Sequence, residues 1–266
     1  MPGHAARCPF SKVFPLAVRN LSLACACALT LAVPAVHAAH PLQTEDTGTQ
    51  GAGNLEIENG LSRARYDATT LTLYQPQLSI GLATTIDAIV QPSVEWVHAS
   101  GQGSISGFGD TNVDAKWRFW GSDPFSLALR AGVALATNQH GLGLTRGTTS
   151  EHGLVALTWD HGPTVVHANV GFTVVPRAPG TPARRVMTGV SAALMQQVNE
   201  HLILTVDSSF AQSPNPHKTT WPGTILAGAI WTARPGLDID LGWQTSVDDR
   251  PVTRTWLAGL TYRFSL

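Results

Sequence analysis

The sequence predicts an all-β fold, an antiparallel transmembrane β-barrel of about 12 strands that follows an N-terminal signal peptide. Three observations support this prediction. The last segment alternates strictly between apolar and polar residues, the chain carries few charges, and its predicted strands are long, with connections that alternate between short and long. The 266 residues are enough for one large barrel.

The C-terminal segment 252–264 shows the pattern most clearly. From Trp256 onward, apolar and aromatic residues occupy every second position, and the positions between them are small or polar apart from Leu257. A period of two places the two sets on opposite faces of a strand. A C-terminal strand of this kind, ending in aromatic residues, is what a transmembrane barrel uses to close on its first strand.

Composition agrees with a membrane barrel. Charged residues make up 13% of the chain, about half the usual share, while 43% of residues are hydrophobic. No segment after the leader has the continuous apolar run of roughly 18 residues that a transmembrane helix needs. The apolar residues are spread in alternation, as a β-barrel requires.

Residues 1–38 are predicted to be a signal peptide. A basic N-terminal region precedes the apolar run 21–36, and Val36-His37-Ala38 resembles a cleavage site. A membrane anchor is the alternative, but the apolar run is short and Pro34 interrupts it. The basic residues and all the cysteines of the leader are Arg7, Lys12, Arg19, Cys8, Cys25 and Cys27.

Loss of this leader changes the chemistry of the mature chain. No cysteine remains, so disulfides and thiolate chemistry are excluded. Removing three cations takes the formal charge from −1 to −4, which excludes nucleic acid as a partner.

The mature chain divides into two parts. Residues 39–53 form a polar, glycine-rich, extended lead-in, placed in the periplasm or the lumen, and 54–266 form the barrel. Most predicted strands have the length that crosses a bilayer at a tilt, whereas ordinary strands average about 5–6 residues. The predicted strands are 54–64, 69–81, 86–98, 110–120, 125–137, 151–160, 164–175, 185–198, 202–212, 224–233, 237–246 and 253–264.

The connections alternate in length. Tight turns are predicted at 83–85, 121–124, 162–163, 199–201 and 234–236. Looser loops are predicted at 99–109, 138–150, 176–184, 213–223 and 247–252, and only the first loop, 65–68, is short. This asymmetry is typical of a bacterial outer-membrane barrel with both termini in the periplasm.

The two faces of each strand differ in chemistry. In the fourth predicted strand, Val113, Ala115, Trp117 and Phe119 share one face, and Asp114, Lys116, Arg118 and Trp120 share the other. The second, eighth and tenth strands alternate poorly, and we expect a bulge at 74–77. Aromatic residues gather near both predicted strand ends, as interfacial girdles do.

Charged residues on the inward faces are the candidate lumen and selectivity residues. If the barrel closes, Glu56 and Glu58 adjoin Arg263. Such charges either form a structural ion-pair network or form a constriction that screens solutes. The candidates are Glu56, Glu58, Asp87, Glu95, Asp114, Lys116, Arg118, Arg130, Asp238, Asp240 and Arg263.

Catalytic and metal-binding patterns are not found, so the sequence predicts a protein that is not an enzyme and has no cofactor. Some twelve-stranded barrels are phospholipases, which need a serine and a histidine together on the lipid-facing side. Ser104 and Ser106 do not satisfy G-x-S-x-G, and we expect them in a glycine-rich loop. His98, His140 and His152 could approach one another at the outer rim, but isolated loop histidines are expected to be solvated.

Four stretches resemble the outer-membrane family named for a MetA pathway of phenol degradation. They are 41–58, 107–119, the Leu-Ala-Thr that begins at Leu135, and the ending Tyr262–Phe264. The resemblance implies an outer-membrane channel for uptake of small, often aromatic, compounds. Two departures are that Ser265 and Leu266 follow the terminal aromatic, and that Glu45-Asp46 stands where the family more often has two aspartates.

Together these observations predict an outer-membrane channel for passive uptake of small compounds, aromatic or hydrophobic ones included. The alternatives are a structural or surface-interaction barrel with a closed lumen that uses loops 138–150 and 213–223, and, less favoured, a lipid-modifying barrel enzyme. The expected partners are outer-membrane lipid, the barrel-assembly machinery and a small solute. The chain is expected to be a monomer of the bacterial outer membrane, exported through its cleaved leader.

Overall fold

The computed structural model describes residues 40–101, 103–138, 148–175, 184–247 and 252–265, and the predicted signal peptide therefore lies outside the described residues. Within these ranges no helix is long and apolar enough to cross a membrane. The strands are β1 (Asn54–Tyr66), β2 (Thr69–Ala83), β3 (Ile86–Gln91), β4 (Val94–Ala99), β5 (Gly103–Phe108), β6 (Thr111–Ser122), β7 (Phe125–Leu135), β8 (Ser150–His161), β9 (Thr164–Val174), β10 (Val186–Gln197), β11 (Leu202–Ala211), β12 (Gly223–Arg234), β13 (Leu237–Val247) and β14 (Arg254–Ser265).

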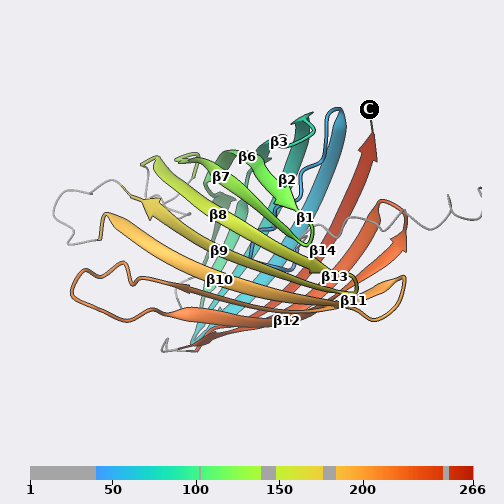
Figure 1. Ribbon diagram of the computed structural model, residues 1–266. Coiled ribbons are helices and arrows are strands. Elements are labelled where there is room, and N and C mark those ends of the chain that lie inside the picture. The colour runs from blue at the N-terminus through green and yellow to red at the C-terminus, as the bar shows by residue number, and fades with distance from the viewer. Residues whose placement is uncertain (1–39, 102, 139–147, 176–183, 248–251, 266) are drawn as a thin grey trace, which may run out of the picture. The chain divides into compact units, whose positions relative to one another are not determined.

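The strands form one closed antiparallel sheet. β1 pairs with β14 along its whole length and also with β2, so the sheet has no free edge at the seam (Figure 1). β3 and β4 both pair with β2 and share one strand position, as do β5 and β6. The 14 segments therefore make a 12-stranded barrel, which confirms the predicted fold class.

The barrel has two unlike ends. The turn end holds both Asn54 and Ser265 and the short turns 84–85, 123–124, 162–163, 198–201 and 235–236. The loop end holds the longer connections between β7 and β8, β9 and β10, β11 and β12, and β13 and β14. In bacterial barrels the short turns face the periplasm, and the long loops face the outside.

The predicted bulge at 74–77 is wrong. β2 stays in unbroken register with β1 through Pro76, and its irregularity lies between Gly81 and Ala83. On its other side β2 changes partner. It pairs with β4 as far as Tyr74, and with β3 from Leu78 onward. Because proline has no N–H to donate, Pro76 fits where β2 has no second partner.

The prediction of a loop at 99–109 is also wrong for residues 103–108, which form a strand. Those residues form β5, which pairs with β4 so that Ser104 lies opposite His98. The glycines and serines of this segment have low strand propensity, but the ladder to β4 satisfies their backbone groups.

Trp120 lies on the opposite face from the one that strict alternation predicts. The register between β6 and β7 shifts between Arg118 and Trp120, so one extra residue returns Trp120 to the outer face, where it is exposed. The bulge thereby adds an aromatic side chain to the girdle at the turn end.

The poor alternation of the predicted eighth and tenth strands, β10 and β12, has a packing cause. Their inward residues are themselves apolar, and Met195 and Ile230 pack with Val165 of β9 in a buried cluster inside the lumen. Leu42, from the lead-in, packs against the same cluster. Both faces of these strands are apolar because one meets lipid and the other meets this filled part of the lumen.

Candidate functional site in the barrel lumen

The described part of the lead-in, residues 40–53, lies inside the barrel. Thr44, Asp46 and Thr47 are fully buried there, although the segment has no regular secondary structure. From Pro41 to Gly53 it follows the inner wall, and it contacts residues of β13, β11, β9, β8, β7, β6, β3 and β2 in turn. The segment therefore occupies the central part of the lumen.

Two cations on neighbouring strands hold the acidic pair of this segment. Lys116 of β6 donates to Glu45 at 2.7 Å and to Asp46 at 2.6 Å. Arg130 of β7 donates to the other carboxylate oxygen of Glu45 and, at 2.6 Å, to Asp114. Burial acts to raise the pKa of Glu45, but the two cations outweigh it and hold that pKa below its ordinary value.

Acidic residues on the remaining wall accept hydrogen bonds from the segment. Asp207 of β11 accepts from the N–H groups of Gln43 and Thr44 at 2.7 and 2.8 Å, and also from the Thr44 hydroxyl. Asp87 of β3 accepts from the N–H of Gln50. The carboxylates of the segment thus pair with cations on β6 and β7. Its N–H groups donate to wall carboxylates on β11 and β3, so the buried cations and carboxylates both have partners.

His40 adds a similar contact near the seam. Its Nδ1 atom lies 2.7 Å from Oδ1 of Asp240 on β13, and its N–H donates to Glu58 on β1 at 3.3 Å. The buried Oδ2 atom of Asp240 has no hydrogen-bond partner among the described residues. His40, the first described residue, therefore contacts two acidic residues of the barrel wall.

Glycines on the inner wall leave room for the segment. An added Cβ at Gly81 of β2 would lie 1.7 Å from the carbonyl oxygen of Gly51. The Pro41 ring lies against Gly228 and Gly242 in the same way. Because only glycine lets two backbones approach this closely, these positions are shaped to the docked segment.

The seam between β1 and β14 is closed by charge as well as by backbone pairing. Arg263 donates to Glu56 at 2.5 Å and to Asp238 of β13 at 2.6 Å. The predicted pairing of Glu56 with Arg263 is confirmed. Glu58 instead accepts from Gln77 of β2 at 2.7 Å and from His40, because it lies farther along β1, beside the segment.

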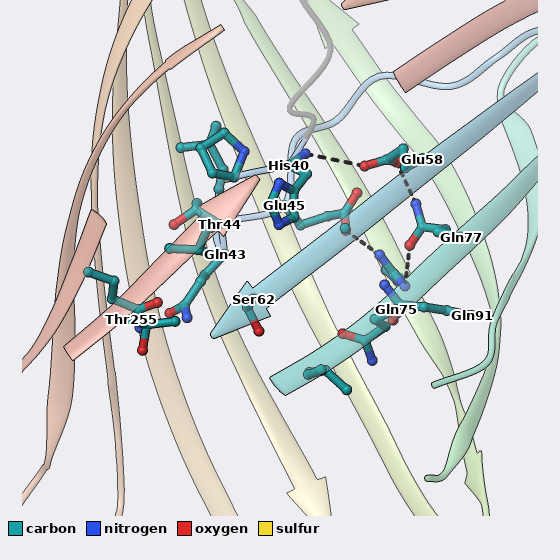
Figure 2. Close-up of a pocket in the computed structure, with 17 residues that line it drawn as sticks. His40, Gln43, Thr44, Glu45, Glu58, Ser62, Gln75, Gln77, Gln91 and Thr255 are labelled. Atoms are coloured by element: carbon teal, nitrogen blue, oxygen red, sulfur yellow. Dashed lines mark hydrogen bonds and ion pairs between the residues drawn. The ribbon is translucent and has the colours of Figure 1, made fainter. Parts of the chain in front are cut away.

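The segment separates two cavities of different size. The larger, of about 360 Å³, lies on its loop-end side, where Glu58 and Gln77 line it together with Glu45 (Figure 2). Arg130 lines it as well. The smaller, on the turn-end side, measures about 10 Å³, roughly the space of one water. Glu45, Glu58 and Gln77 line both cavities, so they mark the constriction between them.

The larger cavity is rich in carboxamides. Its polar lining includes five glutamines, with hydroxyl groups beside them, and three leucines supply an apolar part. These neutral side chains can both donate and accept hydrogen bonds. The lining residues that sequence analysis did not single out include His40, Leu42, Gln43, Thr44, Ser62, Leu73, Gln75, Gln77, Gln91, Gln244 and Thr255.

The structure places the predicted lumen residues on inward faces, but it does not bring all of them to the segment. Arg118 and Glu95 lie on inward positions of β6 and β4, away from the lead-in contacts. Asp238 accepts from Arg263 at the seam and from Thr232 of β12. His152 bonds to Asp114 at 2.7 Å rather than approaching His98. His140 lies outside the described residues.

A serine and a histidine meet on the outer face, near the loop end. Nδ1 of His98 lies 2.8 Å from Oγ of Ser104, and both side chains are exposed. The expectation that Ser104 lies in a loop is wrong, because it belongs to β5. Within the described residues no hydrogen bond orients the other ring nitrogen of His98, as the base of a catalytic pair requires. No cluster of metal-ligating side chains occurs in the part of the chain that the structure describes.

The family comparison covers both the lead-in and the barrel. The family model described as "Putative MetA-pathway of phenol degradation" matches residues 38–264. The chain belongs to this family. The match includes the lead-in, residues 107–119 and the C-terminal strand. The predicted resemblance to this family is thereby confirmed. No curated protein matches the sequence.

Solved structures with a similar fold are outer-membrane channels and porins. The COG4313 outer membrane channel from Pseudomonas putida F1 matches with a TM-score of 0.68 at 12% identity, over 82% of this chain and 98% of that one. The NanC porin matches with 0.59 at 11% identity, over 77% and 98%. The CymD monoaromatic hydrocarbon channel matches with 0.50 at 7% identity, over 83% and 90%. These matches establish the fold.

Proposed function

We propose that this family member is an outer-membrane channel for small solutes, and that residues 40–53 form its constriction. The observation that carries the proposal is the cavity of about 360 Å³ directly above the docked segment. A cavity of this volume holds one small molecule, and ligand sites of roughly 300–1,000 Å³ are common in proteins. We further propose that the leader 1–38 is cleaved on export.

The lining of the cavity favours solutes that combine an apolar body with hydrogen-bonding groups. Leu73 and Leu257 can contact a ring, while the amides of Gln75 and Gln244 can pair with a hydroxyl or carbonyl group. Small hydroxylated aromatic compounds have this chemistry. The family's description and the CymD match support the same class of solute.

Passage through the lumen requires the segment to shift, because the cavity on its turn-end side holds roughly one water. The ion pairs of Lys116 and Arg130 resist this shift, and they also set the charge that a permeating solute meets. Selectivity then comes from Glu45, Glu58 and Gln77 at the constriction.

Conductance and liposome swelling test the proposal. The wild-type barrel and the variant Lys116→Met/Arg130→Met are reconstituted, and permeation of a hydroxylated aromatic is compared with that of a sugar of similar size. We expect the aromatic to pass faster in both proteins, and both solutes to pass faster through the variant. If two folded barrels pass neither solute, the channel function is wrong.

The occluded lumen also favours a second function, a structural barrel with a closed lumen. This role predicts that release of the segment leaves permeation unchanged while the outer-membrane location is kept. Its predicted contact loops are 138–150, most of which lies outside the described residues, and 213–223. The same reconstitution therefore distinguishes the two functions.

A further inference from the structure

A continuous row of hydrogen-bond donors crosses the outer face of six neighbouring strand segments at the loop end. Backbone register places the members directly opposite one another, from β13 through β14, β1, β2 and β4 to β5. We call it the donor row, and its members in order are Thr245, Arg254, Arg65, Thr70, His98 and Ser104.

The donor row points away from the lumen. Ser62, Leu73 and Thr255 line the lumen cavity, and neighbouring residues of a strand point to opposite faces. Arg254 and Arg65 are exposed accordingly, and so are His98 and Ser104.

Tryptophans lie in the next row toward the middle of the barrel. Register places Trp243, Trp256, Arg63, Thr72, Trp96 and Ser106 in that order across the same segments. Trp256 is 68% exposed and Trp96 is 45% exposed. Tryptophan belts mark the level at which lipid headgroups meet acyl chains, so the donor row lies at the headgroup level.

The arginines of these two rows have no counter-ion among the residues that the structure describes. Arg65 lies directly opposite Arg254, and like charges in this position destabilise a sheet. Neither of them, nor Arg63, forms a salt bridge with a carboxylate of the described residues. Arg130 and Arg263, which face the lumen, each have two acidic partners. An external anion between Arg65 and Arg254 would remove the repulsion.

We propose that the donor row binds the phosphate groups of a phosphorylated glycolipid in the outer leaflet of the membrane. Arginine guanidinium groups bind phosphate through paired, charge-assisted hydrogen bonds, and the Thr70 and Ser104 hydroxyls and the His98 ring add further donors. Arg254 and Arg65 are direct neighbours across the β1–β14 ladder, and Thr70 follows on β2, so this part of the row can contact two phosphates of one lipid. Trp256 and Trp96, below it, contact the acyl chains.

Binding of lipid A tests the site. The folded barrel in neutral detergent is titrated with diphosphorylated lipid A, with the same lipid after removal of its phosphates, and with inorganic phosphate. Native mass spectrometry counts bound lipid, and thermal unfolding measures stabilisation. The test variant is Arg65→Gln/Arg254→Gln. The matched control is Arg185→Gln/Arg234→Gln, which removes the same charge at exposed arginines outside the row.

We expect the test variant to bind diphosphorylated lipid A about tenfold more weakly and the control to bind like wild type. Without lipid, the test variant should unfold at the same temperature as wild type or higher, because the repulsion is gone. Lipid A should raise the unfolding temperature of wild type and of the control, but not that of the test variant. Equal binding by the test variant, or equal binding of the dephosphorylated lipid, overturns the proposal. Inorganic phosphate that competes fully with the lipid also overturns it, because the site would then bind a free anion.

Discussion

Arg263 on the last strand donates from Nε to Oε2 of Glu56 on the first strand at 2.5 Å, and the two residues are direct partners across the barrel seam. The same guanidinium reaches Asp238 at 2.6 Å. One cation therefore serves two inward carboxylates on β1 and β13, the two neighbours of β14. The seam depends on this side chain as well as on the backbone ladder.

Replacing Arg263 with glutamate should destabilise the barrel. The change leaves Glu56 and Asp238 without a cation and adds a third negative charge, so we expect a loss of about 3 kcal/mol or more. Heat-modifiable gel mobility and urea unfolding measure it. Arg234→Glu is the control, because this exposed arginine of β12 forms no salt bridge with the described residues. Equal stability of both variants would show that the seam does not use the ion pair.

An alanine at Gly81 should displace the lead-in and raise conductance severalfold. Its Cβ would lie 1.7 Å from the Gly51 carbonyl oxygen, and the segment has to move because β2 is fixed by three partner strands. Gly121→Ala is the matched control, since its Cβ meets Ser126 at an ordinary 3.7 Å. Single-channel recording and protease cleavage within residues 40–53 report the displacement. Unchanged current with an uncleaved segment contradicts the docked geometry.

Removing the cations at 116 and 130 should change ion selectivity. The variant Lys116→Met/Arg130→Met removes two cations that pair with Glu45, Asp46 and Asp114, so the lumen becomes more negative. Reversal potentials under a salt gradient should shift toward cation selectivity. Arg118→Met removes an inward cation that does not contact the segment, and it should produce a smaller shift. A shift of the same size in both would mean that the contact with the lead-in does not matter.

Acidification should release the segment only at strongly acidic pH. The ion pairs lower the pKa of Glu45 in the folded protein below its ordinary 4.5, so their stabilisation is complete above that value and is lost as the pH falls through the lowered pKa. We expect conductance to stay low on acidification past 4.5 and to rise at still lower pH. Glu45→Gln should conduct more than wild type at neutral pH and should lose this step. A step above 4.5 in wild type would contradict the sign of the shift.

Much of the barrel was predictable because strand faces are a local property. Alternation along 110–120 and 237–246 identifies inward charges such as Lys116 and Asp240 without reference to any neighbour. The prediction failed where a neighbour decides the outcome. The bulge that turns Trp120 outward depends on the pairing of β6 with β7, and β5 exists because β4 supplies its ladder. Neither the bulge nor the strand β5 is indicated by the residue pattern of its own segment.

The lumen site was predicted only in part, for a related reason. Its wall residues follow from alternation, but the glutamines of β2, β3 and β13 are uncharged and were not selected. His40 was not selected either, because a single histidine in a polar stretch gives no pattern. The polar, glycine-rich composition of 41–53 favours an extended segment, yet it is equally compatible with a periplasmic position.

By itself, the sequence determined an all-β barrel of 12 strands, its inward and outward faces, and the charge balance of its lumen. Period two and low charge content are properties of the chain, and the bilayer leaves few folds that satisfy them. Only the tertiary structure decided that Glu45 and Asp46 pair with Lys116 and Arg130, and that Arg65 lies opposite Arg254. These residues lie far apart in the sequence, and their contacts arise from closure of the barrel and from its register.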